Sequence, residues 1–217
     1  MACATADSMS PMYVEVFADN PYATNCWLLS ARRSDEAVVV DPGFTPERVR
    51  SLLEAAGKRP VAVLATHGHI DHVGAVREVC GDELPLYIHK EDERALTNPE
   101  AWGAGYPGAP GRPQDVRAIS DGDVIDAAGL ELQVVHTPGH TPGSVCYRAA
   151  GVVLSGDLVF KGTIGRYDFP NSSEDAMRAS LRRFLEFPDE LEVLPGHLDK
   201  TTVGLERATN PFLSSLA

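Results

Sequence analysis

The chain has 217 residues, of which 43% are hydrophobic and 23% charged, a composition typical of a globular protein. Acidic residues outnumber basic ones by 31 to 19, and the net charge of −12 disfavours a nucleic-acid partner. No apolar run approaches the roughly 18 residues of a membrane span, and Met1 to Met12 lacks the regions of a secretory signal. We therefore expect a cytoplasmic protein with no membrane partner.

The chain carries no repeat or charge block that would divide it into domains. We expect residues 1–11 to be a disordered lead-in and residues 12–217 to form a single domain. The cysteines are scattered without a C-x-x-C pair, which favours reduced thiols over a disulfide framework. We expect Cys26 and Cys146, which lie in strand-like stretches, to belong to the core.

In the first half of the chain, apolar and β-branched runs predict strands at residues 38–40, 61–65 and 84–88. Helices are expected at residues 46–56 and 73–80. Thr45 can cap the first of these helices, Pro46 suits its first position, and Gly57 suits its end. The first strand runs into a turn at Asp41, where the carboxylate can either cap the turn or orient a ligand histidine.

The second half begins with a segment, residues 93–113, in which Gly and Pro are dense, and this composition favours an irregular surface loop. Strands are predicted at residues 124–125, 130–135, 145–147, 152–154 and 193–194. Ser172 or Ser173 can cap a helix that carries Met177, Leu181 and Phe184 on one face. Each half of the chain thus contains its own set of strands and helices, which predicts an α/β fold of sheets covered by helices.

The run from Thr66 to His72 places four potential metal ligands, His67, His69, Asp71 and His72, directly after a predicted strand. Histidine and aspartate suit a borderline cation such as Zn²⁺. This spacing suits a loop that aims side chains at different points. One ion would not need four ligands from a single loop together with others from elsewhere, so the run predicts two ions.

Three further candidates each sit where a predicted strand meets a Gly or Pro turn: His140, Asp157 and His197. A lone Gly-His or Gly-Asp is usually only a turn, because glycine adopts unusual backbone dihedrals. Together with the histidine-rich run, however, these residues predict a metal centre. His89 and His136 can support the ligands from behind, but we expect them to be hydrogen-bonded structural histidines. Trp102 and Tyr106 can line the mouth of the site or simply pack within their loop.

The run from Thr66 to His72, followed in order by His140, Asp157 and His197, resembles the metallo-β-lactamase superfamily. Flanking motifs resemble its glyoxalase II (hydroxyacylglutathione hydrolase) branch, in the short single-domain bacterial type. These motifs are Val40-Asp41-Pro42-Gly43, His136 to Ser144, Gly156-Asp157, Ile164-Gly165-Arg166 and Asn210-Pro211-Phe212. The resemblance implies an αββα sandwich with the site at one edge of its two sheets.

Carried onto this sequence, the resemblance implies one metal on His67, His69 and His140 and a second on Asp71, His72 and His197. Asp157 would bridge both ions, opposite a bridging water or hydroxide. Asp71 and Asp157 would therefore be the catalytic side chains. Two divalent ions are expected, with zinc favoured and iron or manganese also compatible with these ligands.

The reaction implied is the hydrolysis of a small-molecule thioester. Two cations lower the pKa of a shared water, and a thiolate with a free pKa of roughly 8.5 leaves almost without a proton donor. Only 20 residues follow His197, so we expect this chain to lack the helical C-terminal domain of longer glyoxalase II enzymes, and Asp199 stands where that type has a tyrosine. Arg166 is retained and is a candidate for binding an anionic group of the substrate.

Other activities remain open on the same scaffold. A persulfide dioxygenase would use one iron on His67, His140 and Asp157, whereas the complete second ligand set and the Pro195-Gly196-His197 motif favour the hydrolase. A lactonase, a phosphodiesterase and a metal-binding module without catalysis are further alternatives. The sequence does not indicate the oligomeric state.

Overall fold

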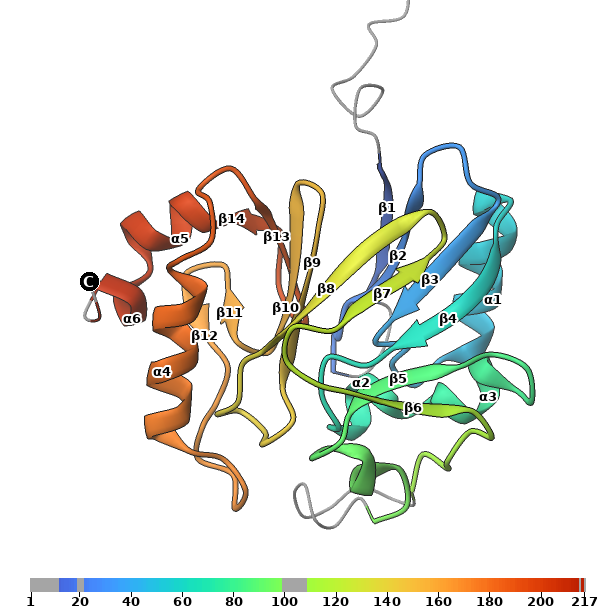
Figure 1. Cartoon of the computed structure of the whole chain (residues 1–217), viewed down its shortest axis with the longest axis horizontal. Coiled ribbons are helices and arrows are strands. Elements are labelled where there is room, and N and C mark those ends of the chain that lie inside the picture. The colour runs from blue at the N-terminus through green and yellow to red at the C-terminus, as the bar shows by residue number, and fades with distance from the viewer. Residues whose placement is uncertain (1–11, 19–21, 99–108, 215, 217) are drawn as a thin grey trace, which may run out of the picture.

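A computed structural model describes residues 12–18, 22–98, 109–214 and 216. Two six-stranded sheets pack face to face, and helices cover their outer faces (Figure 1). The predicted αββα sandwich is therefore confirmed. The proposed lead-in at residues 1–11, Cys3, Trp102 and Tyr106 lie outside the described residues. None of the helices within the described part of the chain has the length and apolarity that a membrane span requires.

The first sheet is antiparallel from β1 to β3 and parallel from β3 to β6. Its strands, in spatial order, are β1 (Met12–Phe17), β2 (Cys26–Ala31), β3 (Glu36–Val40), β4 (Arg59–Leu64), β5 (Leu86–His89) and β6 (Val116–Ile119). Parallel pairing brings the carboxyl ends of β3, β4 and β5 to one edge of the sheet. The residues that follow these three strands, including Asp41, Thr66 and Asp92, therefore gather at that edge.

The second sheet is ordered β14 (Thr201–Thr202), β13 (Glu192–Pro195), β10 (Val152–Gly156), β9 (Val145–Ala149), β8 (Leu130–His136) and β7 (Val124–Ala127). Most of its pairs are antiparallel, but β10 and β13 are parallel. Asp157 and His197, which follow these two strands, therefore emerge side by side. A two-stranded hairpin, β11 (Val159–Phe160) and β12 (Thr163–Ile164), follows Asp157.

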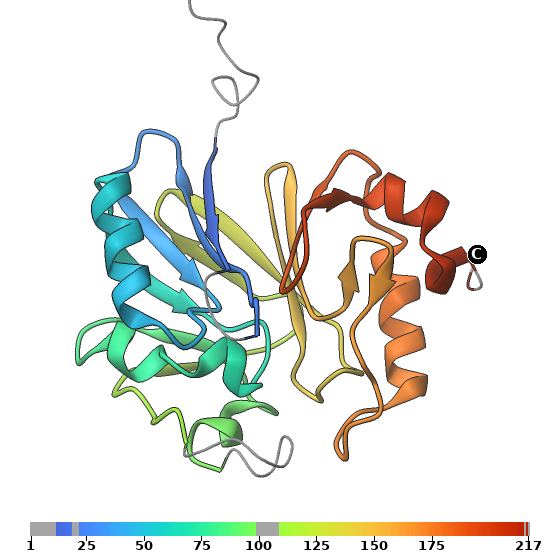
Figure 2. The same cartoon turned by 180° about the vertical axis from the view of Figure 1, so that it is seen from behind.

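The helices are α1 (Pro46–Ala56), α2 (Ile70–Val73), α3 (Val76–Cys80), the 3-10 turn η2 (Glu93–Leu96), α4 (Glu174–Phe184), α5 (Val203–Thr209) and α6 (Pro211–Ser214). Gly57 ends α1 with a φ of 62°, and the Ser173 hydroxyl caps α4 by accepting from the Ala176 amide. Thr45 occupies the cap position of α1, but its hydroxyl makes no capping bond. Figure 2 shows α1 to α3 on one outer face and α4 to α6 on the other.

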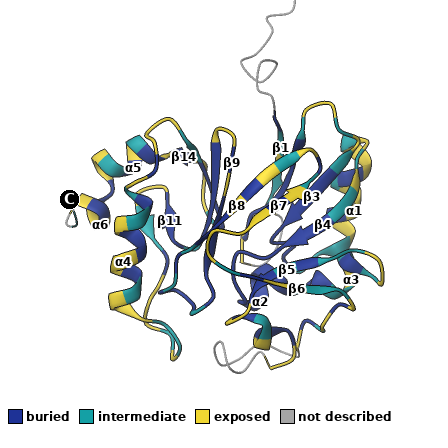
Figure 3. Cartoon of the chain, viewed as in Figure 1, coloured by how far each residue is buried: buried dark blue, intermediate teal, exposed yellow. Residues whose placement is uncertain are grey.

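Three apolar layers hold the sandwich together. Trp27, Leu132 and Tyr147 belong to the layer between the sheets, Val49 of α1 to the layer outside the first sheet, and Phe184 of α4 to the layer outside the second. Each large side chain buried in this way contributes roughly 1.5–3 kcal/mol. Figure 3 shows that burial is concentrated on the strands and on the inner sides of the helices. Both predicted core cysteines are buried.

Candidate metal centre

The fold brings all seven predicted ligands together at one edge of the sandwich. His67 and His69 follow β4, Asp71 and His72 lie in α2, His140 lies between β8 and β9, and Asp157 and His197 follow β10 and β13. Three sets of donor atoms each lie within 4.8 Å of one another: His67, His69 and His140; His67, His72 and Asp157; and Asp71, His72 and His197. We call the first of these sets the first group and the last the second group.

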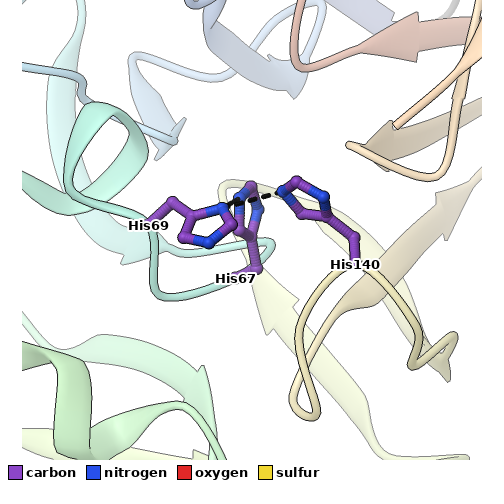
Figure 4. Close-up of side chains that lie close together, drawn as sticks. All are labelled: His67, His69 and His140. Atoms are coloured by element: carbon purple, nitrogen blue, oxygen red, sulfur yellow. Dashed lines mark hydrogen bonds between the residues drawn. The ribbon is translucent and has the colours of Figure 1, made fainter. Parts of the chain in front are cut away.

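In the first group, three imidazole nitrogens converge (Figure 4). Nδ1 of His69 lies 3.1 Å from Nε2 of His67 and 2.8 Å from Nε2 of His140. Burial lowers the pKa of His69 to about 3 and that of His140 to about 4, and it holds the pKa of His67 well below its ordinary value. The three rings are therefore neutral, and each has a lone pair to offer a cation.

Hydrogen bonds on the outer side of these rings fix which nitrogen faces inward. The Thr66 hydroxyl donates to Oδ2 of Asp41 at 2.7 Å, so the hydroxyl oxygen accepts the Nδ1 proton of His67 at 3.1 Å. His140 donates its Nδ1 proton to the carbonyl of Arg166 at 2.7 Å. Both Nε2 lone pairs consequently point into the site, as outer partners of metal-binding histidines arrange them.

The second group contains a carboxylate and is strongly polar. Oδ2 of Asp71 lies 3.5 Å from Nε2 of His72 and 3.3 Å from Nε2 of His197. Burial lowers the pKa of His72, but the charges of Asp71, Asp157 and Asp41 outweigh it and raise that pKa to about 10. Burial likewise raises the pKa of Asp71, but the neighbouring histidines outweigh it and the net shift is downward. The carboxylates around the second group therefore stabilise a positive charge on or between its histidines.

Asp157 lies between the two groups. Its Oδ1 is 3.4 Å from Nε2 of His72, and its Oδ2 is 3.4 Å from Nε2 of His140 and 3.6 Å from Nε2 of His197. Two ligand atoms at about 2.1 Å from one tetrahedral ion would be about 3.4 Å apart. The separations between Asp157 and its neighbours therefore match a pair of ions that share this carboxylate.

Two buried polar atoms test whether cations fit here. Oδ1 of Asp157 and Nε2 of His72 face each other, and neither has a hydrogen-bond partner among the residues that the structure describes. A buried polar atom left unpaired costs about 1–3 kcal/mol. A cation between them would satisfy both, so the residues present fit divalent metal ions.

The segment of residues 23–25 holds the second group from outside. The Thr24 hydroxyl donates to Oδ2 of Asp71 at 2.9 Å, and Nδ1 of His197 lies 3.3 Å from the Ala23 carbonyl. Asn25 donates to the carbonyls on either side of the Gly196-His197 pair. Gly196 itself must lack a side chain, because a Cβ atom there would lie 2.3 Å from Oδ1 of Asp157.

The predicted loop from His67 to His72 needs a correction. Asp71 and His72 lie in α2, whose first carbonyl, that of His69, accepts from the amides of His72 and Val73. Ile70 and Val73 are three residues apart, and both are buried, which fixes this helical turn against the core. The helix predicted at residues 73–80 begins only at Val76, as α3, and Val73 is the last residue of α2.

The two open interpretations of Asp41 are resolved by its contacts. Its carboxylate accepts from the amide and hydroxyl of Thr66 and from Nδ1 of His72, the last at 2.9 Å. Asp41 therefore orients His72, a member of the second group. His89 and His136 belong to none of the donor sets; their rings stack 4.1 Å apart, and His136 lies 2.8 Å from the Pro142 carbonyl, as expected of structural histidines.

Arg166 lies beside the first group. Its exposed guanidinium pairs with Asp168 at 2.9 Å and lies 4.5 Å from the centre of the Phe169 ring. That ring in turn meets His69 edge-on at 4.9 Å between centroids. Phe169, Thr24 and Asp92 are site residues that the sequence did not reveal, because each stands outside a ligand motif.

Comparison with known proteins identifies the family. Residues 19–197 match the family model described as the metallo-beta-lactamase superfamily, and the chain belongs to this superfamily. A relative from Aquifex aeolicus, described only as an uncharacterized protein, is 41% identical over 94% of this chain and 99% of its own length. Hydroxyacylglutathione hydrolase GloC of Haemophilus influenzae is 31% identical over 94% of this chain and 99% of its own length.

Two solved structures are similar over nearly the whole chain. The crystal structure of the B3 metallo-beta-lactamase BLEG-1 has a TM-score of 0.85 and 32% identity, covering 93% of this chain and 100% of that one. The structure of TTHA1623 in a di-iron-bound form has a TM-score of 0.79 and 40% identity, covering 92% of this chain and 100% of that one. Superfamily and donor sets together indicate a metal-dependent hydrolase with a binuclear site.

Proposed function

We propose that the protein is a thioesterase of the hydroxyacylglutathione hydrolase type, which cleaves a small-molecule acyl thioester into an acid and a thiol. The observation that carries the proposal is the position of Asp157 between two complete donor groups. We assign the first ion to His67, His69 and His140 and the second to Asp71, His72 and His197. Asp157 is assigned as their shared ligand, and zinc is the metal we expect in both places.

Two bound divalent ions would supply an activated water and would neutralise the charge that develops on a carbonyl oxygen. The residues of the chain hold the reacting groups in place. Asp41 and the carbonyl of Arg166 fix the rings of His72 and His140, and Asp157 sets the spacing between the groups. A leaving thiolate with a free pKa of roughly 8.5 needs no strong proton donor. This suits a site whose acidic side chains are already engaged with histidines.

The similarity to GloC supports a glutathione thioester as the substrate class. Phe169 offers an apolar wall beside His69, against which an acyl group or thiol carrier can pack. Arg166 is our candidate for binding an anionic group of the carrier. Because its guanidinium is exposed and shares its charge with Asp168, we expect this contact to add little affinity.

The test is a substrate panel assayed on metal-loaded protein whose metal content is measured in parallel. The panel contains S-lactoylglutathione, an acyl coenzyme A, a lactone, a phosphodiester and a cephalosporin, together with oxygen uptake in the presence of a persulfide. We expect two ions per chain and thioester hydrolysis that chelation abolishes. Oxygen uptake by a protein with one iron, or cleavage of the cephalosporin alone, would overturn the proposal.

A further inference from the structure

Asp92 is a buried carboxylate that touches both loops of the first group. It lies between β5 and η2 and is 0% exposed. Its Oδ2 accepts from the amide of Gly68 at 2.7 Å and from the hydroxyl of Thr141 at 2.6 Å. Its Oδ1 accepts from the amide of Gly143 at 2.7 Å. One side chain thus receives three hydrogen bonds from two separate segments.

These donors flank the three histidines of the first group. Gly68 stands between His67 and His69, and Thr141 directly follows His140. The loop with His67 and His69 leaves the first sheet, whereas the loop with His140 joins two strands of the second sheet. Asp92 therefore ties together, across the sandwich, the two segments whose separation determines whether the three nitrogens can converge.

The approach of the second loop to Asp92 is close. A Cβ atom at position 143 would lie 2.6 Å from Cγ of Asp92, so only glycine allows this backbone amide to reach the carboxylate. Asp92 is itself held by backbone bonds, because its amide donates to the His89 carbonyl and its carbonyl accepts from the Ala95 amide. The carboxylate is thus a fixed anchor to which both loops are attached.

We propose that Asp92 is a positioning residue that sets the metal affinity of the first group. The proposal rests on the assignment of His67, His69 and His140 as ligands of one ion. All three partners of Asp92 donate, so the side chain must accept at both oxygens, as an ionised carboxylate does. An asparagine can keep the two bonds at the Oδ2 position, but it then turns an NH₂ group toward the Gly143 amide. The His140 loop then keeps its bond from Thr141 but loses the bond from Gly143, whereas the His67 loop keeps its bond from Gly68.

The chain offers a matched control in Glu206. This carboxylate is also buried, at 1% exposed, and also accepts three hydrogen bonds. Its Oε2 receives the Gly162 amide and the Asn210 side chain, and its Oε1 receives the Thr201 hydroxyl. None of these partners is a candidate ligand or adjoins one. A change from Glu206 to Gln therefore tests the cost of removing a buried charge without touching the first group.

The experiment measures zinc affinity by competition with a chelator in chains that carry His197→Ala, which leaves the first group complete. We expect Asp92→Asn to raise the zinc Kd by about 10–100-fold, the range for outer partners of metal ligands. Glu206→Gln should leave that Kd within about twofold. Thr141→Val, which removes one of the three donors, is a milder variant, and it should give an intermediate increase even if Asp92→Asn does not fold.

Equal zinc affinities in the Asp92, Thr141 and Glu206 variants would overturn the proposal, because Asp92 would then support only the fold. The readout involves no substrate. A protein that binds zinc as expected but hydrolyses no thioester would overturn the proposed function and leave the role of Asp92 intact.

Discussion

The two donor groups lie on either side of Asp157 but differ in charge and in the way the chain holds them. The first group consists of three buried histidines whose pKa values are lowered, on loops that approach from both sheets. The second group contains Asp71 and two histidines with raised pKa values. Residues 23–25 and Asp41 hold the second group from outside, whereas Asp92 links the loops of the first.

This difference shows that one site can combine two kinds of preorganisation. In the first group the rings are neutral before metal arrives, so the main requirement is geometric: two loops must stay at the right separation. In the second group the carboxylates already attract a positive charge, so a metal ion must compete with protons for the same atoms. Substitutions of Asp157, of residues within each group and of the outer partners of each group can test the geometric requirement and the competition with protons separately.

The largest effect is expected at Asp157, which we assign as the shared ligand. Asp157→Ala should lower the rate of hydrolysis by about 10³-fold or more, because neither group keeps the carboxylate that offsets repulsion between two ions. Circular dichroism should show an intact fold, and metal analysis should show fewer than two ions. Asp82→Ala, at an exposed carboxylate outside both donor groups, is the control. Retention of two ions and most of the rate would contradict the assignment of Asp157.

The next effect separates the groups. His140→Ala removes a ligand from the first group, and His197→Ala removes one from the second. Each variant should bind one ion per chain and lose about 10²-fold or more in rate, because the proposed reaction uses both ions. Metal analysis after dialysis checks the stoichiometry. If either variant keeps two ions or loses both, the groups are not the separate sites that we assign.

A smaller effect is expected from the outer partner of the second group. Asp41→Asn weakens the acceptor for Nδ1 of His72, so zinc affinity measured in chains carrying His140→Ala should fall by about 10–100-fold. Stability should also fall, by about 1–3 kcal/mol, because Thr66 loses a charged acceptor as well. Chelator competition and thermal unfolding measure the two quantities. An unchanged zinc Kd would mean that Asp41 serves only the turn.

The smallest effect concerns the substrate. Arg166→Ala should raise KM about 3–10-fold and change kcat less than about twofold, because a charge contact away from the carbonyl stabilises substrate and transition state alike. The carbonyl that holds His140 belongs to the backbone and survives this change. Asp168→Asn, which frees the guanidinium, should lower KM or leave it unchanged. If KM is unchanged in both variants, another surface binds the thiol carrier.

The sequence by itself determined the donor types and their order along the chain. Four candidate ligands within the run from Thr66 to His72 predicted metal binding, and the turns at His140, Asp157 and His197 supplied the remaining candidates. Local patterns also predicted most of the main strands and a cap for α4 at Ser172 or Ser173, of which the structure uses Ser173. These features are local, because apolar periodicity and turn chemistry act over a few residues.

Only the tertiary structure decided which groups surround the ligands. The sequence analysis did not predict the edge strands β1 (MYVEVF) and β6 (VRAI), which their pairing with β2 and β5 identifies as strands. The turn of α2 depends on the core that receives Ile70 and Val73. Asp92 and Thr24 are single polar residues without a motif, and their roles arise because chain segments distant in sequence meet beside the histidines. A contact between residues distant in sequence leaves no local sequence pattern, so only the folded structure shows that these residues belong to the site.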